Sequence, residues 1–230
     1  MSEGLMVKGM NARQIKIIAC VSMLFSHVGI IFWPYTLWWQ IPGRIAMPLF
    51  AYMIANGARM SRDPKKYLAR LIIYALVIQY PYSIFLGLRY LNICFTLSLG
   101  LLAILLWQSG LPLLTRVPLV MALGLMAEFC GVEYGIYGVM MIFAAHLFFT
   151  DWRSLGLCWL LINLPYLADG AIALLQGEQY PIVQGLCILA LPFLRFYNGE
   201  RGGGSRWEFY IFYIGHMAFL YGLRLILWGY

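Results

Sequence analysis

Long runs of apolar residues, separated by short polar breaks, divide the chain almost from end to end. A bilayer has a hydrocarbon core of about 30 Å, which a helix of about 20 apolar residues spans. The runs predict an all-α polytopic membrane protein with a bundle of about nine transmembrane helices, or of eight or ten, because 134–149 is short and 165–180 is weakly apolar. The predicted spans are 15–34, 38–59, 67–87, 91–108, 111–129, 134–149, 154–168, 179–197 and 207–228.

The composition supports the same class of protein. Of the 230 residues, 63% are hydrophobic and 11% are charged, whereas soluble domains carry roughly 25% charged residues. This excludes an ordinary soluble domain, and 1–230 is predicted to form a single integral membrane domain. Residues 1–14 are a short polar segment before the first span. This span is expected to be retained and not removed as a signal peptide. The stretch 198–206 contains three consecutive glycines and is expected to be a flexible loop.

The basic residues predict the orientation. The chain has 16 Lys and Arg against 9 Asp and Glu, a net charge of +7. The basic residues lie between the apolar runs rather than on a soluble surface, so nucleic acid is not an expected partner. Cytoplasmic loops of membrane proteins retain Lys and Arg. Most of the basic residues lie in the cytoplasm if the N-terminus does, and 1–14 and 198–206 are therefore predicted to be cytoplasmic.

Few ionisable residues lie within the predicted spans. Such residues are costly in a bilayer unless they face a partner or a cavity, and they are therefore candidates for function. His27 lies in the middle of the first span, and His216 lies at a similar depth in the ninth, within possible reach across the bundle. An interhelical hydrogen bond is the structural alternative for His27, and simple packing is the alternative for His216. His146, near the inner end of the sixth span, is expected to be structural.

Lys16 and His27 are predicted to share one face of the first helix. Eleven residues at about 100° each return to within about 20° of the same direction, about 16 Å further along the axis. Such a pair puts an ammonium at the cytoplasmic mouth of a groove and an imidazole near the bilayer centre. This arrangement suits a ligand with an anionic end and a buried reactive end. The alternative for Lys16 is an anchor whose ammonium reaches the interface.

Arg44 lies about six residues into the second span, between Pro42-Gly43 and Pro48. An arginine stays charged and must meet an anion, carbonyl oxygens or water at this depth. The glycine and the prolines predict a distorted helix with free carbonyl groups, which ligand cavities also use. The alternative is an internal ion pair with Glu128 or Glu133.

Several enzyme classes lack their motifs in this chain. There is no P-loop, no GxGxxG, no GxSxG and no HExxH, and the five cysteines are scattered singly without metal-site spacing. No carboxylate lies in mid-span. Nucleotide hydrolysis, serine hydrolysis, metal chemistry and a carboxylate ion relay are therefore disfavoured, and no metal is expected.

Seven stretches, in order along nearly the whole chain, resemble the TraX family. They are Met10–Ala19, Met23–Gly29, Gly43–Ala51, Lys65–Leu71, Asn92–Leu97, Tyr134–Gly138 and Phe212–Met217. The resemblance implies an integral protein of the bacterial inner membrane, related to the acetylase of conjugative pilin and to transmembrane acyltransferases that use acetyl-CoA. In those relatives a basic residue lies eleven positions before a first-helix histidine that is regarded as catalytic. Lys16 and His27 occupy these positions, but Ser26 replaces the aspartate that is common before the histidine.

The residues and the resemblance together predict an acetyltransferase that moves an acetyl group from acetyl-CoA to an amine or hydroxyl of a protein, peptide or glycan. Membrane lipids are expected to surround the protein. His27 is expected to act as a base or an acyl carrier. Arg44, His216, Asn92, Tyr134 and Ser26 are expected to line the site. The residues predicted to attract the nucleotide end of acetyl-CoA are Lys16, Arg59, Arg62, Lys65, Lys66 and Arg70.

A transporter without covalent chemistry is the competing hypothesis. Helices broken at Gly43–Pro48 and at Pro81 would suit a substrate site near the bilayer midplane. The absence of an evident sequence repeat and of a buried acid to couple an ion speaks against it.

Overall fold

The computed structural model describes residues 9–34, 36–87, 89–177, 182–205 and 207–229. Residues 1–8 of the predicted N-terminal segment, 179–181 of the predicted eighth span and residue 206 of the predicted loop lie outside the described residues. The described chain is helical, and its strand-like features are two isolated bridges between single residues.

Every predicted apolar run contains a helix, but the helix of the seventh run continues to Leu175, beyond its predicted end at 168, and the eighth run contains a 3-10 helix and a short α-helix. The elements are α1 (Ala12–Phe32), α2 (Leu37–Gly43), α3 (Ala46–Met60), α4 (Pro64–Leu86), α5 (Ile93–Trp107), α6 (Leu113–Phe129), α7 (Gly135–Leu147), α8 (Trp152–Leu175), the 3-10 helix η1 (Ile182–Ala190), α9 (Leu191–Arg195) and α10 (Glu208–Trp228). Within the described ranges, α1, α4, α8 and α10 are long and apolar enough to cross a membrane. The chain is an all-α membrane protein, and nine crossings stay a prediction.

The helix starts follow from local sequence. At α1, the Asn11 side chain accepts a hydrogen bond from the backbone N–H of Gln14, and the Gln14 side chain accepts one from the backbone N–H of Asn11. This reciprocal arrangement satisfies two amide groups that a helix start leaves open. Asp63 caps α4 by accepting a hydrogen bond from the Lys66 N–H (3.0 Å), with Pro64 following in the first turn, where a proline fits.

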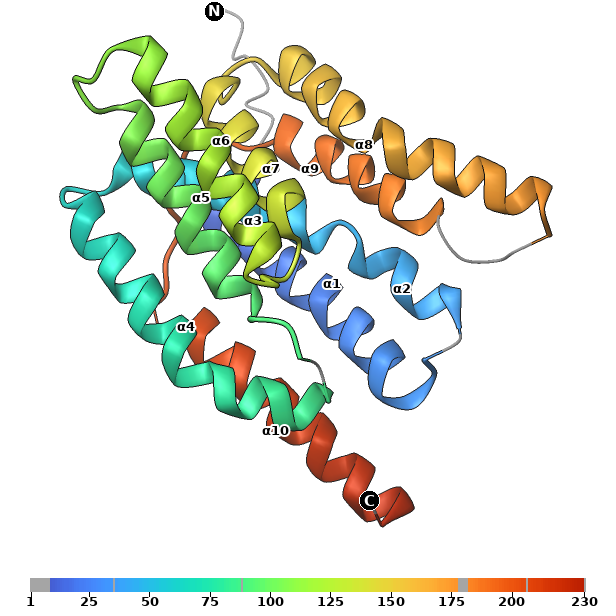
Figure 1. The fold of residues 1–230 in the computed structure, drawn as a ribbon. Helices are drawn as coiled ribbons and strands as arrows, with labels where there is room; N and C mark the ends of the chain where they lie inside the picture. Colours follow the sequence, from blue (N-terminus) through green and yellow to red (C-terminus); the bar gives the residue numbers. More distant parts are fainter. Residues whose placement is uncertain (1–8, 35, 88, 178–181, 206, 230) are drawn as a thin grey trace, which may run out of the picture.

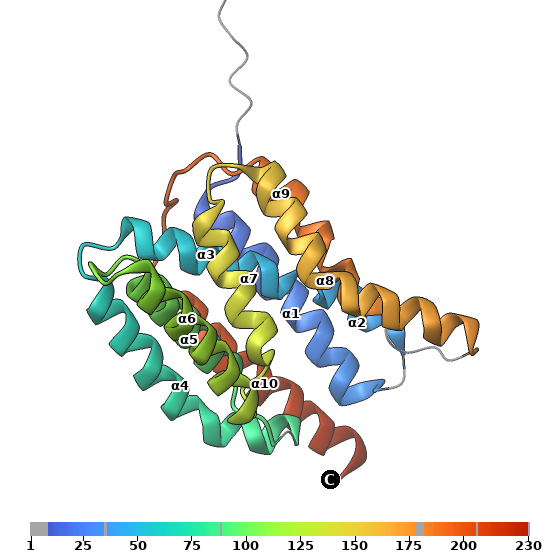
Figure 2. The ribbon, with the colours of Figure 1, turned by 45° about the horizontal axis from the view of Figure 1, so that its top comes forward.

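The bundle is built around α3, most of which is buried. This helix contacts α1, α5, α7 and η1, while α4 and α10 lie side by side along one edge and α8 with η1 along another (Figures 1 and 2). Large apolar side chains point outward from the peripheral helices, including Leu76, Leu114, Leu175 and Ile226. An outer surface of this kind fits contact with lipid acyl chains.

The second predicted span is interrupted at Arg44, as its glycine and prolines indicated. α2 ends at Gly43 and α3 begins at Ala46. The break predicted at Pro81 is wrong, because α4 continues through this residue to Leu86. A transmembrane helix tolerates a proline when its surroundings satisfy the freed backbone group.

The glycine-rich loop before α10 is tied to the start of α1. The Met10 N–H donates to the Phe196 carbonyl (2.7 Å), the Asn198 N–H to the Met10 carbonyl (2.9 Å) and the Ala12 N–H to the Glu200 carbonyl (2.8 Å). The starts of α1 and α10 are thereby held together at one end of the bundle, which is the predicted cytoplasmic end. These two helices carry His27 and His216.

Candidate functional site

Two adjoining cavities lie between the helices. The outer cavity, of about 280 Å³, is lined among others by His27, Arg44 and Glu133. The inner cavity, of about 750 Å³, lies at the predicted cytoplasmic end and is lined among others by Lys16. Three residues line both cavities: Met23, Ile93 and Tyr213. We call these residues the junction.

His27 and His216 form a buried pair beside the outer cavity. Nδ1 of His27 lies 2.7 Å from Nε2 of His216, and Nδ1 of His216 lies 2.7 Å from the carbonyl oxygen of Phe212. The side chains are 6% and 8% exposed, respectively. The structure therefore brings together the two histidines that the sequence placed at similar depth.

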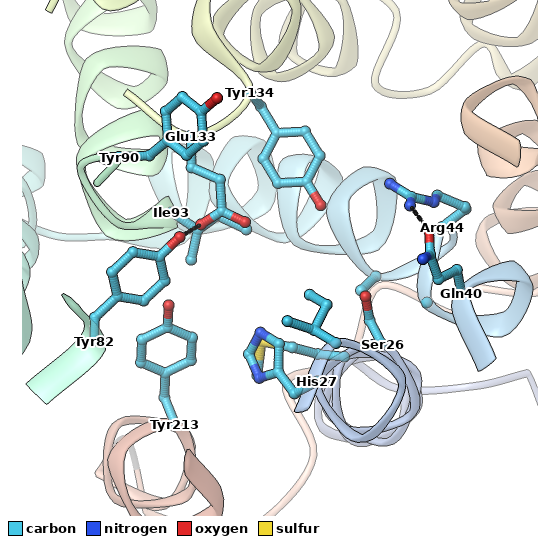
Figure 3. A pocket seen from close by; sticks show the side chains of 14 residues that line it. Ser26, His27, Gln40, Arg44, Tyr82, Tyr90, Ile93, Glu133, Tyr134 and Tyr213 are labelled. Carbon is cyan, nitrogen blue, oxygen red and sulfur yellow. Dashed lines mark hydrogen bonds between the residues drawn. The ribbon is translucent and has the colours of Figure 1, made fainter. Parts of the chain in front are cut away.

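The hydrogen bonds assign the proton positions in the neutral pair. A carbonyl oxygen accepts and cannot donate, so Nδ1 of His216 carries a proton and its Nε2 is an acceptor. Nδ1 of His27 then donates to that acceptor, which leaves Nε2 of His27 without a proton. Figure 3 shows the His27 ring at the cavity edge with one nitrogen turned toward the space. His27 thus presents an unprotonated nitrogen to the cavity, and His216 orients it.

Ser26 is packed against the end of α2 and lines the outer cavity. A Cβ at Gly43 would lie 2.5 Å from the Ser26 Cβ, so this contact needs a glycine. In this chain the acceptor that orients the imidazole is His216, on another helix, and not the residue before His27.

Glu133 is a main residue of the site that the sequence offered only as an alternative ion-pair partner of Arg44. It follows α6 in a turn held by a bridge between Leu91 and Val132, and its N–H donates to the Leu91 carbonyl (2.8 Å). Tyr134 next to it has a φ of 65°, the one positive value among described non-glycine residues. Strained backbone of this kind is often found at functional sites. The turn directs both side chains into the outer cavity (Figure 3).

The Glu133 carboxylate accepts a hydrogen bond from the Tyr82 hydroxyl (3.1 Å). The backbone N–H of Ile93 also donates to it, and the side chains of Tyr134, Tyr213 and Arg44 line the same cavity. Burial raises the pKa of the Glu133 carboxyl to about 7, against the smaller lowering by the hydrogen bonds from Tyr82 and Ile93 and by the Arg44 charge. A carboxyl with this pKa can exchange a proton near neutral pH.

Arg44 lines the outer cavity from the break between α2 and α3. Its guanidinium donates to the side-chain oxygens of Gln184 (2.9 Å) and Gln40 (2.8 Å), and its buried Nε has no hydrogen-bond partner. In the described part of the chain it forms no ion pair with Glu128 or Glu133, so that alternative is wrong. Both of its partners are neutral amides, and the guanidinium keeps its full positive charge toward the cavity.

The inner cavity is basic. Five of its lining residues are Lys16, Arg62, Lys66, Arg70 and Arg201. Arg201 was not predicted, because it lies in the glycine-rich loop far along the chain. Arg59 and Lys65 are not among the lining residues, and the Arg59 guanidinium instead lies 4.6 Å from the centre of the Phe149 ring.

Two further predictions come out differently in the structure. Asn92 lines neither cavity; it caps α5 by accepting from the Cys94 N–H (3.0 Å) and donates to the Ala75 carbonyl (2.9 Å). Lys16 and His27 do lie along one side of α1, but in different cavities, because the junction residue Met23 stands between them. The single predicted groove is thus two cavities in series.

Fold and site together define an all-α membrane protein with a histidine pair beside a polar outer cavity, which adjoins a basic inner cavity. The family model described as TraX protein matches residues 11–224, and the chain belongs to this family. It is 30% identical, over 94% of its length and 97% of the relative's, to the probable fimbrial assembly protein FimC of serogroup H1 from Dichelobacter nodosus. No solved structure matches the chain.

Proposed function

We propose that the protein is an acetyltransferase of the bacterial inner membrane that moves an acetyl group from acetyl-CoA to an amine or hydroxyl acceptor. The observation that carries the proposal is the hydrogen bond between His27 and His216, which leaves Nε2 of His27 unprotonated at the outer cavity, next to the junction with a basic inner cavity. A transporter needs no such oriented base, and family membership adds weight to group transfer.

The inner cavity fits the charge pattern of acetyl-CoA. This donor has phosphate groups at one end, a thioester at the other and a thin arm between them. Arg62, Lys66 and Arg201 at the cavity wall suit the phosphates, since guanidinium and ammonium groups are the usual phosphate ligands in proteins. The arm would follow Lys16 and Cys20 along α1 and bring the thioester to the junction, next to His27.

In the proposed reaction the acceptor attacks the thioester carbon from the outer cavity. Nε2 of His27 takes the proton of the attacking amine or hydroxyl, the carbon–sulfur bond breaks, and the leaving CoA sulfur receives the proton from the imidazolium. Products are the acetylated acceptor and free CoA, and His27 returns to its neutral form. His216 holds the imidazole in the reactive tautomer throughout.

Arg44 and Glu133 suit acceptor binding. The guanidinium would bind an anionic group of the acceptor, and the carboxylate would bind its ammonium or relay its proton. The name of the Dichelobacter relative refers to fimbrial assembly. A fimbrial subunit is therefore the first protein acceptor to test.

The test uses detergent-purified protein, radiolabelled acetyl-CoA and a purified fimbrial subunit. Wild type should release free CoA and label the acceptor, and His27→Ala should lose the activity by about 10²- to 10⁴-fold, the usual contribution of a positioned base. His146→Ala is the matched control, because His146 lies on α7 and lines neither cavity. Failure of wild type to release CoA, together with absence of thermal stabilisation by CoA, would favour the transporter.

A further inference from the structure

The junction between the two cavities contains one hydrogen-bonding side chain. Met23 and Ile93 offer only apolar groups there, whereas Tyr213 offers a hydroxyl. Under the proposed function, the thioester carbon lies at this point, because the donor comes from one cavity and the acceptor from the other. A group at the junction is therefore close to the reacting atoms.

Tyr213 is only 5% exposed, and its hydroxyl is buried without a hydrogen-bond partner. Buried hydroxyls in proteins are nearly always hydrogen-bonded, and an exception requires a reason. Figure 3 shows this hydroxyl directed into the outer cavity, toward the side where Tyr82 and Glu133 already bond to each other. Tyr82 is thus engaged, and Tyr213 is free to donate to a bound ligand.

Tyr213 is also placed in register with the histidine pair. It lies three residues before His216 on α10, so both side chains leave the helix on neighbouring positions of one face. Its ring centre is 6.4 Å from that of His27 and 5.9 Å from that of His216. A base and a hydroxyl donor therefore flank the same small space from α1 and α10.

We propose that Tyr213 is a catalytic residue that stabilises the oxyanion of acetyl transfer, an inference that rests on the proposed function. When the acceptor attacks, the carbonyl π electrons move to the thioester oxygen, and the Tyr213 O–H donates a hydrogen bond to that oxygen. The electrons return as the carbon–sulfur bond breaks, and the tyrosine keeps its proton. Catalysis by such a donor requires its geometry to be preset, which a buried helix residue provides.

The test compares Tyr213→Phe with wild type in the CoA-release assay. Loss of one oxyanion donor typically lowers kcat by about 10²- to 10³-fold, and KM for acetyl-CoA should stay within about twofold. Tyr221→Phe is the matched control, since Tyr221 lies two turns further along α10, packs on Phe85 and lines neither cavity. A wild-type kcat in Tyr213→Phe, or a change in KM alone, would overturn the proposal.

A second measurement does not depend on the folding of that variant. The second measurement uses ¹³C-carbonyl acetyl-CoA bound to the His27→Ala variant. Its infrared carbonyl band should lie at a lower frequency than the band of acetyl-CoA in a solvent without hydrogen-bond donors, because a hydrogen bond weakens the carbonyl bond. A band at the unbonded position would overturn the role of Tyr213. Wild type that releases no CoA would instead refute the proposed function, and this proposal with it, so the two failures are distinguishable.

Discussion

Replacing His216 by phenylalanine tests the assignment of protons within the histidine pair. Phenylalanine keeps a planar ring in the same space but removes the Nε2 acceptor, which lies 2.7 Å from Nδ1 of His27. The His27 Nδ1–H would then be buried without a partner. The imidazole can avoid this by moving its proton to Nε2, which faces the outer cavity and would no longer be basic.

The size of the effect follows from the cost of the unsatisfied donor. Leaving a buried N–H unpaired costs about 1–3 kcal/mol. If that energy appears entirely as a shift between tautomers, the reactive form becomes about 5- to 150-fold less populated, at about 1.4 kcal/mol for each factor of ten. We therefore expect kcat for CoA release to fall within that range, with KM for acetyl-CoA unchanged because the inner cavity is not altered.

The assay is steady-state release of free CoA by detergent-purified protein. His146→Phe makes the same substitution on α7, away from both cavities, and should retain wild-type kcat. A kcat within twofold of wild type in His216→Phe, or an equal loss of activity in the His146 control, would contradict the proton assignment.

Three further predictions address other parts of the structure. The Glu133 carboxyl has a pKa of about 7 and can accept a proton only when it is ionised, above that pH. Activity of the wild type should therefore rise through pH 7, and Glu133→Gln should flatten this rise. An unchanged pH profile in the variant would contradict a role of Glu133 in proton transfer. Arg201→Glu should raise the CoA concentration needed for half-maximal thermal stabilisation by at least about tenfold. An unchanged concentration would show that Arg201 is not part of the donor site. Gly138→Ala should lower the free energy of unfolding by about 1–3 kcal/mol, and with it the thermal midpoint, because its Cβ would clash with the Thr96 side chain. Gly222→Ala, where nothing lies within 4 Å, should leave the midpoint unchanged.

The helices could be predicted because bilayer thickness and backbone hydrogen bonding leave few alternatives for long apolar runs. The break around Arg44 could also be predicted, from Pro42, Gly43 and Pro48 close together, and α2 does end at Gly43. Pro81 shows the limit of this argument: the same residue type continues within α4. Whether a proline ends a helix depends on neighbours that are distant in sequence.

The candidate site could be predicted where charge conflicts with depth. His27, Arg44 and His216 stood out because polar groups are costly within apolar runs, and all three gather around the outer cavity or the pair beside it. Asn92 met the same criterion, but the structure uses it to cap α5. Polarity at depth therefore identifies buried groups without separating site residues from helix caps.

Glu133 and Tyr213 could not be predicted, for opposite reasons. Glu133 lies in a short polar connection, where an acid normally faces water, and only the bridge between Leu91 and Val132 turns it inward. Tyr213 is one of 16 tyrosines in an aromatic-rich chain, and its unpartnered hydroxyl is a property of packing, not of sequence. Arg201 likewise reaches the inner cavity only because its loop is tied to the start of α1.

The location of bound CoA shows whether an acyl donor enters through the inner cavity and is discharged at His27. A cryo-electron microscopy structure with CoA should show the phosphates near Arg62, Lys66 and Arg201, and the thiol at the junction beside His27. CoA bound elsewhere, or with its thiol directed away from the junction, would contradict the account.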